Sequence, residues 1–252
     1  MPDLGDDLTT AVVIPTYNEA ENLPQLVSVL FSLPIDARLI IIDDHSPDGT
    51  GSIADGLAAA DPMRIQVIHR AGKLGLRSAY LTGFRVALDG GAGTIAQMDA
   101  DLSHDPSELV NMVPLTGEFD LVLGSRYVKG GRVDSDWPLW RKALSAFGNL
   151  YARSILGVPL HDLTTGFRVW RKEALAGMPL ERLRANGYVF LVEMAYLACC
   201  LNYRCCEHPI YFCERQHGRS KMSLGIQVEA ALRVWQVLWT YRDLRKTHSG
   251  VC

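Results

Sequence analysis

Short apolar runs alternate with longer amphipathic stretches along the first half of the chain. The runs 11–14 and 39–42 are continuous and rich in β-branched residues, which is typical of strands buried on both faces of a parallel sheet. The pattern predicts strands near 11–15, 38–43, 65–69, 94–98 and Asp120–Leu123, and helices over Glu21–Leu33, Gly49–Ala60, Leu76–Leu88 and Pro106–Val113. This alternation predicts an α/β fold with a Rossmann-like, mostly parallel sheet flanked by helices.

The second half adds further helices, one of them over Pro138–Leu156, and a strand around Glu207–Cys213. A chain of 252 residues with 48% hydrophobic content can bury one sizeable core. We therefore expect a tail over 1–10, a single domain over 11–225, an amphipathic helix over 226–242 and a tail over 243–252.

The helix expected over 226–242 has one polar stripe and a wide apolar arc. The stripe contains Glu229, Arg233, Gln236 and Thr240, and the arc contains Val228, Leu232, Trp235, Leu238 and Trp239. Such an arc fits a core helix, a partner's groove or a helix lying in a membrane interface. A core helix is the first interpretation, and the two tryptophans followed by basic residues add weight to the membrane interface. No apolar run reaches the roughly 18 residues of a membrane-spanning helix.

Composition narrows the function classes. A net charge of −3 argues against a general nucleic-acid binder. Basic residues still outnumber acidic ones between Arg126 and Arg153, so we expect an anionic partner there. The six cysteines lack the spacing of zinc ligands, and we expect reduced thiols. The first ten residues do not resemble a secretory signal, so we expect the catalytic face to be cytoplasmic.

The main chemical signal is Asp99-Ala100-Asp101, which follows the apolar run 94–98. Two carboxylates at a strand end can hold Mg²⁺ or Mn²⁺ against a diphosphate, although an isolated Asp-X-Asp also fits a solvated loop. Tyr17, Glu19 and Asp44 follow two other expected strands, and ligands of parallel sheets bind beyond such carboxyl ends. The pattern favours a nucleotide-sugar site, whereas a dinucleotide-binding fingerprint and a Walker motif are absent from the sequence.

The order of these motifs resembles the inverting family 2 glycosyltransferases, in the branch of dolichol- and polyprenol-phosphate mannose synthases. The resemblance covers about Val12 to Gln236. It rests on the segments Pro15–Glu19, Asp43–Thr50, Met98–His104, Gly124–Tyr127, Asp162–Arg168, Gly187–Phe190 with Glu193-Met194, and Gly218–Lys221.

The resemblance implies a GT-A fold, a Mg²⁺ or Mn²⁺ cofactor and roles for individual residues. Donor contacts correspond to Pro15, Tyr17, Glu19, Ile42, Asp44, Asp99, Ala100, Asp101, Arg215 and Lys221. The metal ligands correspond to Asp99, Asp101 and Ser103, where Ser103 replaces the Gln of some relatives. The acceptor phosphate corresponds to Arg126, Arg141 and Ser145. Asp99, Asp101 and Arg126 are then the catalytic residues.

Arg141 and Ser145 lie one turn apart on the expected helix over Pro138–Leu156, so both can face one anion. Trp137, Leu139 and Trp140 either meet the first isoprene units or pack internally. Asp162 is the candidate base if the acceptor is a hydroxyl, and otherwise orders its turn or touches the sugar. The role of Glu193 stays open, and His104, His161 and His217 are expected to be structural or exposed.

We expect mannose transfer, with inversion, from GDP-mannose to a polyprenyl or dolichyl phosphate. The expected setting is the cytoplasmic face of a membrane, with a small membrane subunit as a possible partner. A second interpretation keeps the fold but uses UDP-glucose, UDP-N-acetylglucosamine or a saccharide acceptor. Interpretations of other classes are a non-catalytic membrane-associated binding subunit and a nucleotidyltransferase.

Overall fold

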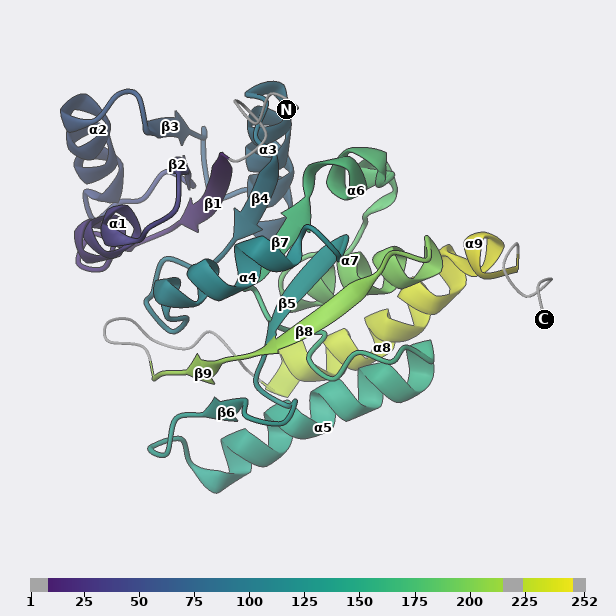
Figure 1. The fold of residues 1–252 in the computed structure, drawn as a ribbon. Helices are drawn as coiled ribbons and strands as arrows, with labels where there is room; N and C mark the ends of the chain where they lie inside the picture. The colour runs from purple at the N-terminus through teal and green to yellow at the C-terminus, as the bar shows by residue number, and fades with distance from the viewer. Residues whose placement is uncertain (1–8, 215–223, 247–252) are drawn as a thin grey trace.

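A computed structural model describes residues 9–214 and 224–246 (Figure 1). These residues form a seven-stranded sheet with the order β3-β2-β1-β4-β7-β5-β8. Its strands are β1 (Thr10–Thr16), β2 (Ala37–Asp43), β3 (Ile65–His69), β4 (Thr94–Gln97), β5 (Leu121–Ser125), β7 (Arg168–Arg171) and β8 (Cys205–Pro209). Only β7 runs antiparallel to its neighbours, so the expected α/β fold with a mostly parallel sheet is confirmed.

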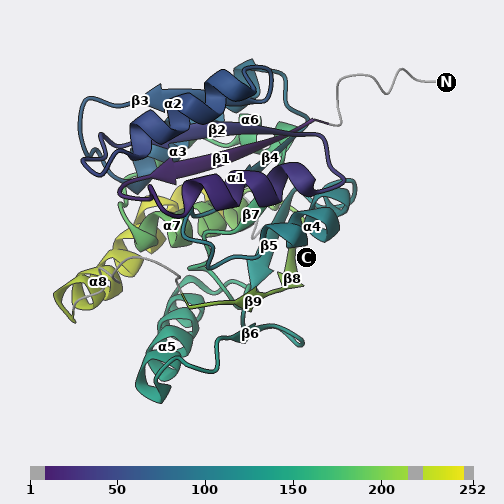
Figure 2. The same cartoon turned by 90° about the vertical axis from the view of Figure 1, so that its left-hand side faces the viewer.

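Helices cover both faces of the sheet (Figures 1 and 2). The first face carries α1 (Leu23–Ser32), α2 (Thr50–Ala60) and α4 (Leu109–Leu115), which follows the 3₁₀ turn η1 (Pro106–Glu108). The second face carries α3 (Leu76–Asp89), α5 (Leu139–Leu156), α6 (Lys172–Gly177), α7 (Tyr188–Cys200) and α8 (Leu224–Thr240), with η2 (Leu180–Arg182) before α7 and α9 (Arg242–Lys246) after α8. Alternate residues of β1 and β2 enter the two separate cores, which is why these strands read as continuous apolar runs.

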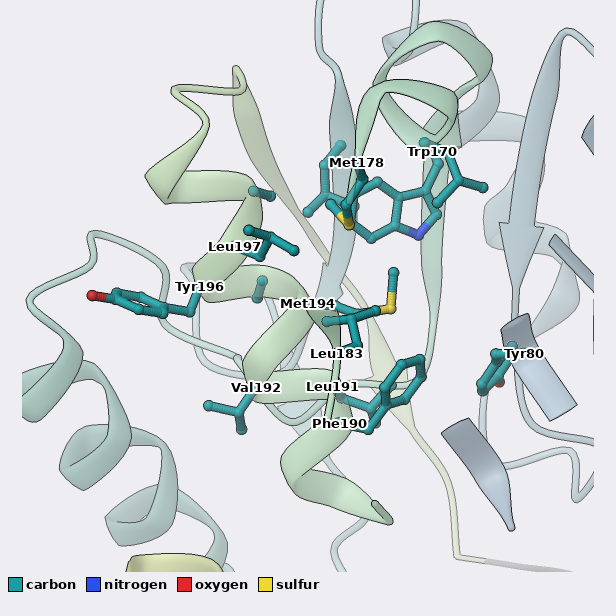
Figure 3. Packing of buried hydrophobic residues seen from close by; sticks show 14 of the residues in the cluster. Tyr80, Trp170, Met178, Leu183, Phe190, Leu191, Val192, Met194, Tyr196 and Leu197 are labelled. Atoms are coloured by element: carbon teal, nitrogen blue, oxygen red, sulfur yellow. The ribbon is translucent and has the colours of Figure 1, made fainter. Parts of the chain in front are cut away.

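The helix α7 forms the centre of the larger core (Figure 3). Its sequence is apolar on all sides, and a helix of that kind is stable only when it is buried on all sides. Glu193 is its one acidic residue. The Glu193 carboxylate accepts the backbone N–H groups of Arg184 and Ala185 and the hydroxyl of Tyr241, so this residue joins the chain before α7 to the end of α8.

The C-terminal helix buries one stripe and exposes another. In α8, Val234 and Val237 are buried against the core, as is Tyr241 directly after the helix, whereas Leu232, Trp235 and Trp239 are exposed. One side of the helix is therefore a core element. The helix α9 begins at the last residue of the helix expected over 226–242 and extends into the expected tail, where Arg182 donates two hydrogen bonds to the Asp243 carboxylate.

Two smaller differences from the sequence-based expectations concern strands. The sequence analysis does not predict the strand β7, because its apolar run is only Val169-Trp170, flanked by Arg168 and Arg171. The strand expected around Glu207–Cys213 is divided into β8 and β9 (Tyr211–Phe212), and β9 pairs with β6 (Arg132–Val133) outside the main sheet.

None of the helices in the described parts of the chain is long and apolar enough to cross a bilayer. The described cysteines, which are Cys199, Cys200, Cys205, Cys206 and Cys213, are free thiols, as expected for these five.

Tight packing of α3 on β1 generates a stability prediction. A Cβ on Gly83 would overlap the Cγ1 atom of Val13, which lies in the middle of β1. We expect Gly83→Ala to lower the free energy of unfolding by about 1–3 kcal/mol because the core has no room for the methyl group. Urea denaturation measures this change.

Gly56→Ala is the matched control, because Gly56 also lies in a helix interior and a Cβ there meets no atom within 4 Å. This variant should gain about 0.5–1 kcal/mol from the higher helix propensity of alanine. Equal stability of the two variants would contradict the packing argument.

Candidate active site

The strand ends that carry the expected donor residues meet at one edge of the sheet. The strands β1, β2 and β4 are parallel neighbours, and the chain order reverses between β1 and β4. The crevice at such a reversal is the usual ligand site of an open α/β sheet. Tyr17 and Glu19 follow β1 on one side of this reversal, and Asp99 and Asp101 follow β4 on the other.

The loop after β1 is held by its neighbours. The backbone N–H of Glu19 donates to Thr50 Oγ1 at 2.9 Å, and Asn22 Nδ2 donates to the Glu19 carboxylate at 2.8 Å. The Lys73 ammonium lies 3.7 Å from the centroid of the Tyr17 ring. Pro15 and Tyr17 are half-buried, so this loop offers surface to a ligand.

Asp44 is buried and ion-paired. Arg70 Nη1 lies 2.7 Å from Asp44 Oδ1, and the backbone N–H of Gly75 donates to Asp44 Oδ2 at 3.0 Å. The carboxylate therefore fixes the loop between Arg70 and Gly75 against the end of β2. The Ile42 side chain lies fully in the core, so a donor contact of this residue would use its main chain.

The acidic loop after β4 is ordered by local hydrogen bonds. The hydroxyl and the backbone N–H of Ser103 both donate to Asp101 Oδ1, and Leu102 adopts a positive φ of 57° that allows this turn. Ser103 is fully buried, so in this structure it orients Asp101, and its expected role as a metal ligand stays a prediction. Ala100 is buried beside them.

Asp99 lies against the start of β7. A Cβ on Gly166 would come within 3.1 Å of Asp99 Oδ2, so glycine lets the carboxylate approach the main chain of the 162–166 turn. Carboxylate oxygens on a fixed loop fit Mg²⁺ or Mn²⁺, which prefer oxygen ligands. Residues 9–214 and 224–246 contain no group of three or more His, Cys, Asp and Glu side chains around a common metal position. An ion here would draw its remaining ligands from a substrate and water.

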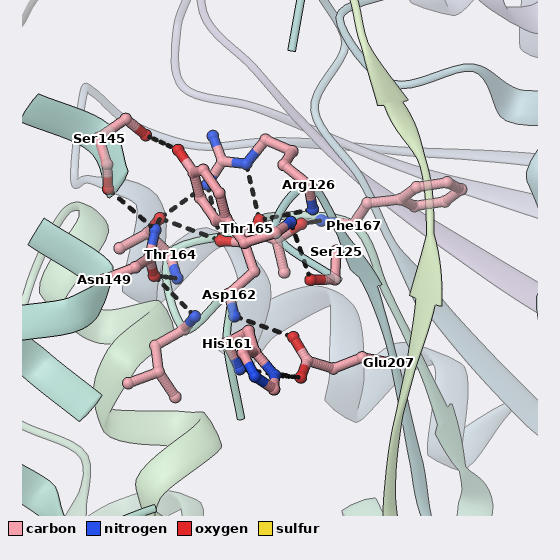
Figure 4. A network of polar contacts seen from close by, with 12 residues as sticks. Ser125, Arg126, Ser145, Asn149, His161, Asp162, Thr164, Thr165, Phe167 and Glu207 are labelled. Carbon is pink, nitrogen blue, oxygen red and sulfur yellow. Dashed lines mark hydrogen bonds and ion pairs between the residues drawn. The ribbon is translucent and has the colours of Figure 1, made fainter. Parts of the chain in front are cut away.

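The end of β5 carries a buried ion pair (Figure 4). Arg126 Nε and Nη2 each donate to the Asp162 carboxylate at 2.7 Å, and the Arg126 backbone N–H donates to it at 3.0 Å. Burial raises the pKa of the Asp162 carboxyl, but the charge and hydrogen bonds of Arg126 outweigh burial and hold this pKa below its ordinary value. Asp162 is therefore a weak base, which argues against the base role considered from the sequence.

Asn149 connects this ion pair to α5. Its Nδ2 donates to Thr164 Oγ1 at 3.0 Å, and its Oδ1 accepts the backbone N–H groups of Leu163 and Thr164. Thr164 Oγ1 also accepts from Arg126 Nη2 at 2.8 Å. The helix that carries Arg141 and Ser145 is thus tied to the turn that holds Arg126 (Figure 4).

Three further side chains support the acceptor side. Tyr127 donates to Ser145 Oγ at 2.6 Å, so the residue next to Arg126 contacts α5 directly. Glu207 of β8 accepts the backbone N–H groups of His161 and Asp162. Arg168 is fully buried and donates to the carbonyl oxygens of Leu163 and Thr165, and burial lowers its pKa to about 10.

Aromatic rings connect Arg126 to Arg141. The Arg126 guanidinium lies 5.2 Å from the Phe212 ring centroid, and the Arg141 guanidinium lies 3.7 Å from that of Trp137. Trp137 and Phe212 pack edge to face at 5.6 Å. The Trp137 side chain is therefore buried and packs internally, whereas the Leu139 and Trp140 side chains are exposed.

The structure places the expected donor residues at the ends of β1, β2 and β4, and it links the expected acceptor residues Arg126, Arg141 and Ser145 through Tyr127, Trp137 and Phe212. Arg215 and Lys221, the remaining expected donor residues, lie outside the described residues, as does His217. Sequence reasoning missed Asn149, Phe212 and Glu207. A buried Asn on an amphipathic helix was the available signal for Asn149, whereas Phe212 and Glu207 gave none.

Comparisons with known proteins show the family of this chain. The family described as Glycosyl transferase family 2 matches residues 11–177. Polyprenol monophosphomannose synthase of Mycolicibacterium smegmatis is 44% identical over 96% of this chain and 91% of its own length. Undecaprenyl-phosphate mannosyltransferase of Micrococcus luteus is 42% identical over 92% of this chain and 96% of its own length.

Two solved structures share the fold. Glucosyl-3-phosphoglycerate synthase from Mycobacterium tuberculosis, in complex with Mn²⁺, UDP and glucosyl-3-phosphoglycerate, is 18% identical and superposes with a TM-score of 0.63 over 92% of this chain and 79% of that one. The mannosyltransferase PcManGT from Pyrobaculum calidifontis, in complex with GDP-Man and Mn²⁺, is 14% identical with a TM-score of 0.54 over 97% and 76%.

The buried ion pair predicts the effect of Asp162→Asn. This variant leaves the Arg126 charge buried without its counter-ion, which should lower the free energy of unfolding at pH 7 by about 3–5 kcal/mol. A carboxyl with a lowered folded-state pKa stabilises the fold above its unfolded pKa of about 4 and stops doing so as the pH falls through the folded value. The difference between wild type and variant should therefore shrink below about pH 4.

Denaturant titrations at several pH values measure both effects. Asp120→Asn is the control, because Asp120 pairs with Arg204 at the surface and should cost less than about 1 kcal/mol. Equal losses in the two variants at pH 7 would show that the Asp162 pair has no special role.

Proposed function

The chain belongs to glycosyl transferase family 2, and we propose that it is a polyprenyl-phosphate mannosyltransferase that uses GDP-mannose as its donor. The names of the two curated relatives support mannosyl transfer to a polyprenyl phosphate. Each shares over 40% identity with nearly the whole chain. The observation in this structure that carries the proposal is the Arg126–Asp162 pair. It fixes the Arg126 cation in position, and it engages both carboxylate oxygens of Asp162 and lowers the pKa of that carboxyl, which disfavours Asp162 as a base.

The reaction is a displacement at the anomeric carbon of mannose. An oxygen of the acceptor phosphate forms a bond to the anomeric carbon, while the bond between that carbon and the β-phosphate oxygen of GDP breaks. The products are GDP and a mannosyl phospholipid with inverted configuration at the anomeric carbon. A phosphate monoester has a second pKa of about 6 and is largely dianionic at neutral pH, so it needs no protein base. A hydroxyl acceptor would need one, and the engagement of Asp162 therefore favours the phosphate.

The donor side binds the nucleotide and its diphosphate. Tyr17, Glu19 and the loop fixed by Asp44 border the place for base and ribose at the reversal between β1 and β4. Asp99 and Asp101 are the residues that would hold Mg²⁺ or Mn²⁺. When bound, such an ion stabilises the charge that develops on the leaving diphosphate. Ser103 and Gly166 keep the two carboxylates in position.

The acceptor side supplies orientation. The guanidinium plane of Arg126 is fixed by Asp162, so it can align a phosphate without losing side-chain freedom when the ligand binds. Arg141 and Ser145 extend this surface along α5. Phosphate recognition by two guanidinium groups is consistent with a lipid phosphate as the nucleophile.

The transfer assay tests the donor and the acceptor together. Radiolabel should pass from GDP-mannose to a phosphorylated polyprenol in the presence of Mg²⁺ or Mn²⁺, and UDP-glucose or UDP-N-acetylglucosamine should transfer at most slowly. Asp101→Asn should lower kcat/KM by at least about 100-fold, because loss of one charged ligand weakens transition-state stabilisation by several kcal/mol.

Asp89→Asn is the control, since Asp89 is exposed at the end of α3 and away from the site; its activity should be that of wild type. Label from a UDP-sugar alone would overturn the donor assignment, and equal activity of both variants would overturn the role of Asp101.

We also propose that α5 and α8 rest on a membrane surface, where the lipid acceptor resides. The two helices pack side by side through a hydrogen bond from Trp235 Nε1 to Tyr151 Oη (Figure 1). Together they expose the molecule's largest group of apolar side chains among the described residues: Leu139, Trp140, Phe147, Leu150, Leu232, Trp235 and Trp239. Arg242 lies 5.8 Å from the Trp239 ring, as suits an anionic bilayer surface. The cytoplasmic face and the small membrane subunit stay predictions.

Vesicle binding tests this surface. Replacing Trp140, Trp235 and Trp239 together with Ser should reduce binding to vesicles of anionic phospholipid by at least about ten-fold, because each replacement removes apolar area that would be buried in the membrane interface. Met63→Ser is the control, since Met63 is also exposed but lies on the loop before β3. Sedimentation measures binding, and equal binding of both variants would contradict the proposal.

A further inference from the structure

We propose that Glu214 is a specificity-determining residue, an internal anion that occupies Arg141 until a dianionic phosphate monoester displaces it. This proposal rests on the proposed function, because it takes Arg141 as part of the acceptor-phosphate site.

The contact is direct. Arg141 Nη1 donates to both carboxylate oxygens of Glu214, at 2.9 and 2.8 Å. The Arg141 side chain is one quarter exposed and that of Glu214 is 44% exposed, so both groups remain accessible to a ligand. A carboxylate here has the charge sign and the oxygen geometry of an acceptor phosphate.

The backbone places Glu214 at this position. The residue follows β9, which pairs with β6 beside the start of α5 (Figure 1). The backbone N–H of Glu214 donates to Asp134 Oδ2 at 2.9 Å, and that of Cys213 donates to the carbonyl oxygen of Ser103 at 2.9 Å. The segment 213–214 thus spans from the acidic donor loop to the acceptor helix.

The pair is weak enough to be displaced. Exposed ion pairs contribute about 0–1 kcal/mol, because water screens them and side-chain entropy opposes them. The stacking of Arg141 on Trp137 stays available when the carboxylate leaves, so the guanidinium keeps its position. A phosphate dianion interacts more strongly with a guanidinium than a carboxylate monoanion does, and it should exchange with Glu214.

The competition gives selectivity at a membrane surface. Ordinary phospholipids are phosphodiesters and carry a single phosphate charge, and they greatly outnumber any lipid phosphate monoester. Without Glu214 their head groups would reach Arg141 beside the exposed residues Leu139 and Trp140. With Glu214 in place, a monoanionic head group gains little by exchange, whereas the dianionic acceptor still gains.

Glu214→Gln removes the competing charge and keeps the size of the side chain. In neutral detergent micelles we expect the KM for polyprenyl phosphate to fall by about two- to five-fold, which corresponds to about 1 kcal/mol at most. The KM for GDP-mannose should not change. Added phosphatidylglycerol should inhibit the variant at two- to five-fold lower concentration than the wild type, roughly as the same displaced contact predicts. Phosphatidylcholine should inhibit neither protein, because the choline cation makes its head group neutral overall.

Glu173→Gln is the matched control, since Glu173 forms an exposed pair with Arg171 at the opposite end of β7. Its kinetic constants should equal those of wild type. An acceptor KM that is unchanged or higher in Glu214→Gln, or equal sensitivity to phosphatidylglycerol, would overturn the proposal. A merely structural role of Glu214 could only raise this KM.

Binding of geranylgeranyl monophosphate, measured by calorimetry without donor, separates this proposal from the proposed function. Tighter binding by Glu214→Gln supports the role of Glu214 even if no mannose is transferred, whereas absence of transfer by wild type counts against the enzymatic assignment alone. Equal binding by both proteins would refute the displacement of Glu214.

Discussion

The ion pair between Arg126 and Asp162 is the constraint on which the acceptor side of this molecule depends. Both groups are buried, so separation of the pair would leave a charge in a medium that solvates it poorly. A buried pair adds little net stability, because desolvation offsets much of the attraction. Its main consequence here is geometric. Through Thr164 and Asn149 the pair fixes the position of α5, and Arg141 and Ser145 with it.

The antiparallel strand β7 joins the donor and acceptor halves of the site. It lies between β4 and β5 and runs opposite to both, so its start reaches the edge where those strands end. The turn before it therefore contacts Asp99 through Gly166 and Arg126 through Asp162. One short turn therefore sets the separation between the proposed diphosphate site and the proposed acceptor-phosphate site, and in-line displacement would depend on that separation.

The helices α5 and α8 divide their apolar residues between two environments. Val234 and Val237 fill the core, while Trp235 and Trp239 face outward. A soluble partner is not needed to explain such a surface when the acceptor itself is a lipid. The exposed apolar side chains lie on α8 and on α5, which also carries Arg141. The proposed recognition of a lipid phosphate and the proposed contact with a bilayer would therefore use the same part of the fold.

The sequence by itself determined the alternation of strands and helices in the first half, and the chemistry at the ends of β1, β2 and β4. Both are local signals, since a strand's apolar run and the polar residues after it are neighbours in the chain. Motif order likewise indicated Arg126, Arg141 and Ser145. Only the tertiary structure decided the partners of these charges: Asp162 for Arg126, Arg70 for Asp44 and Glu214 for Arg141. Each partner is distant in sequence, and its pairing depends on where the chain returns to the sheet edge, which no local pattern of apolar and polar residues encodes.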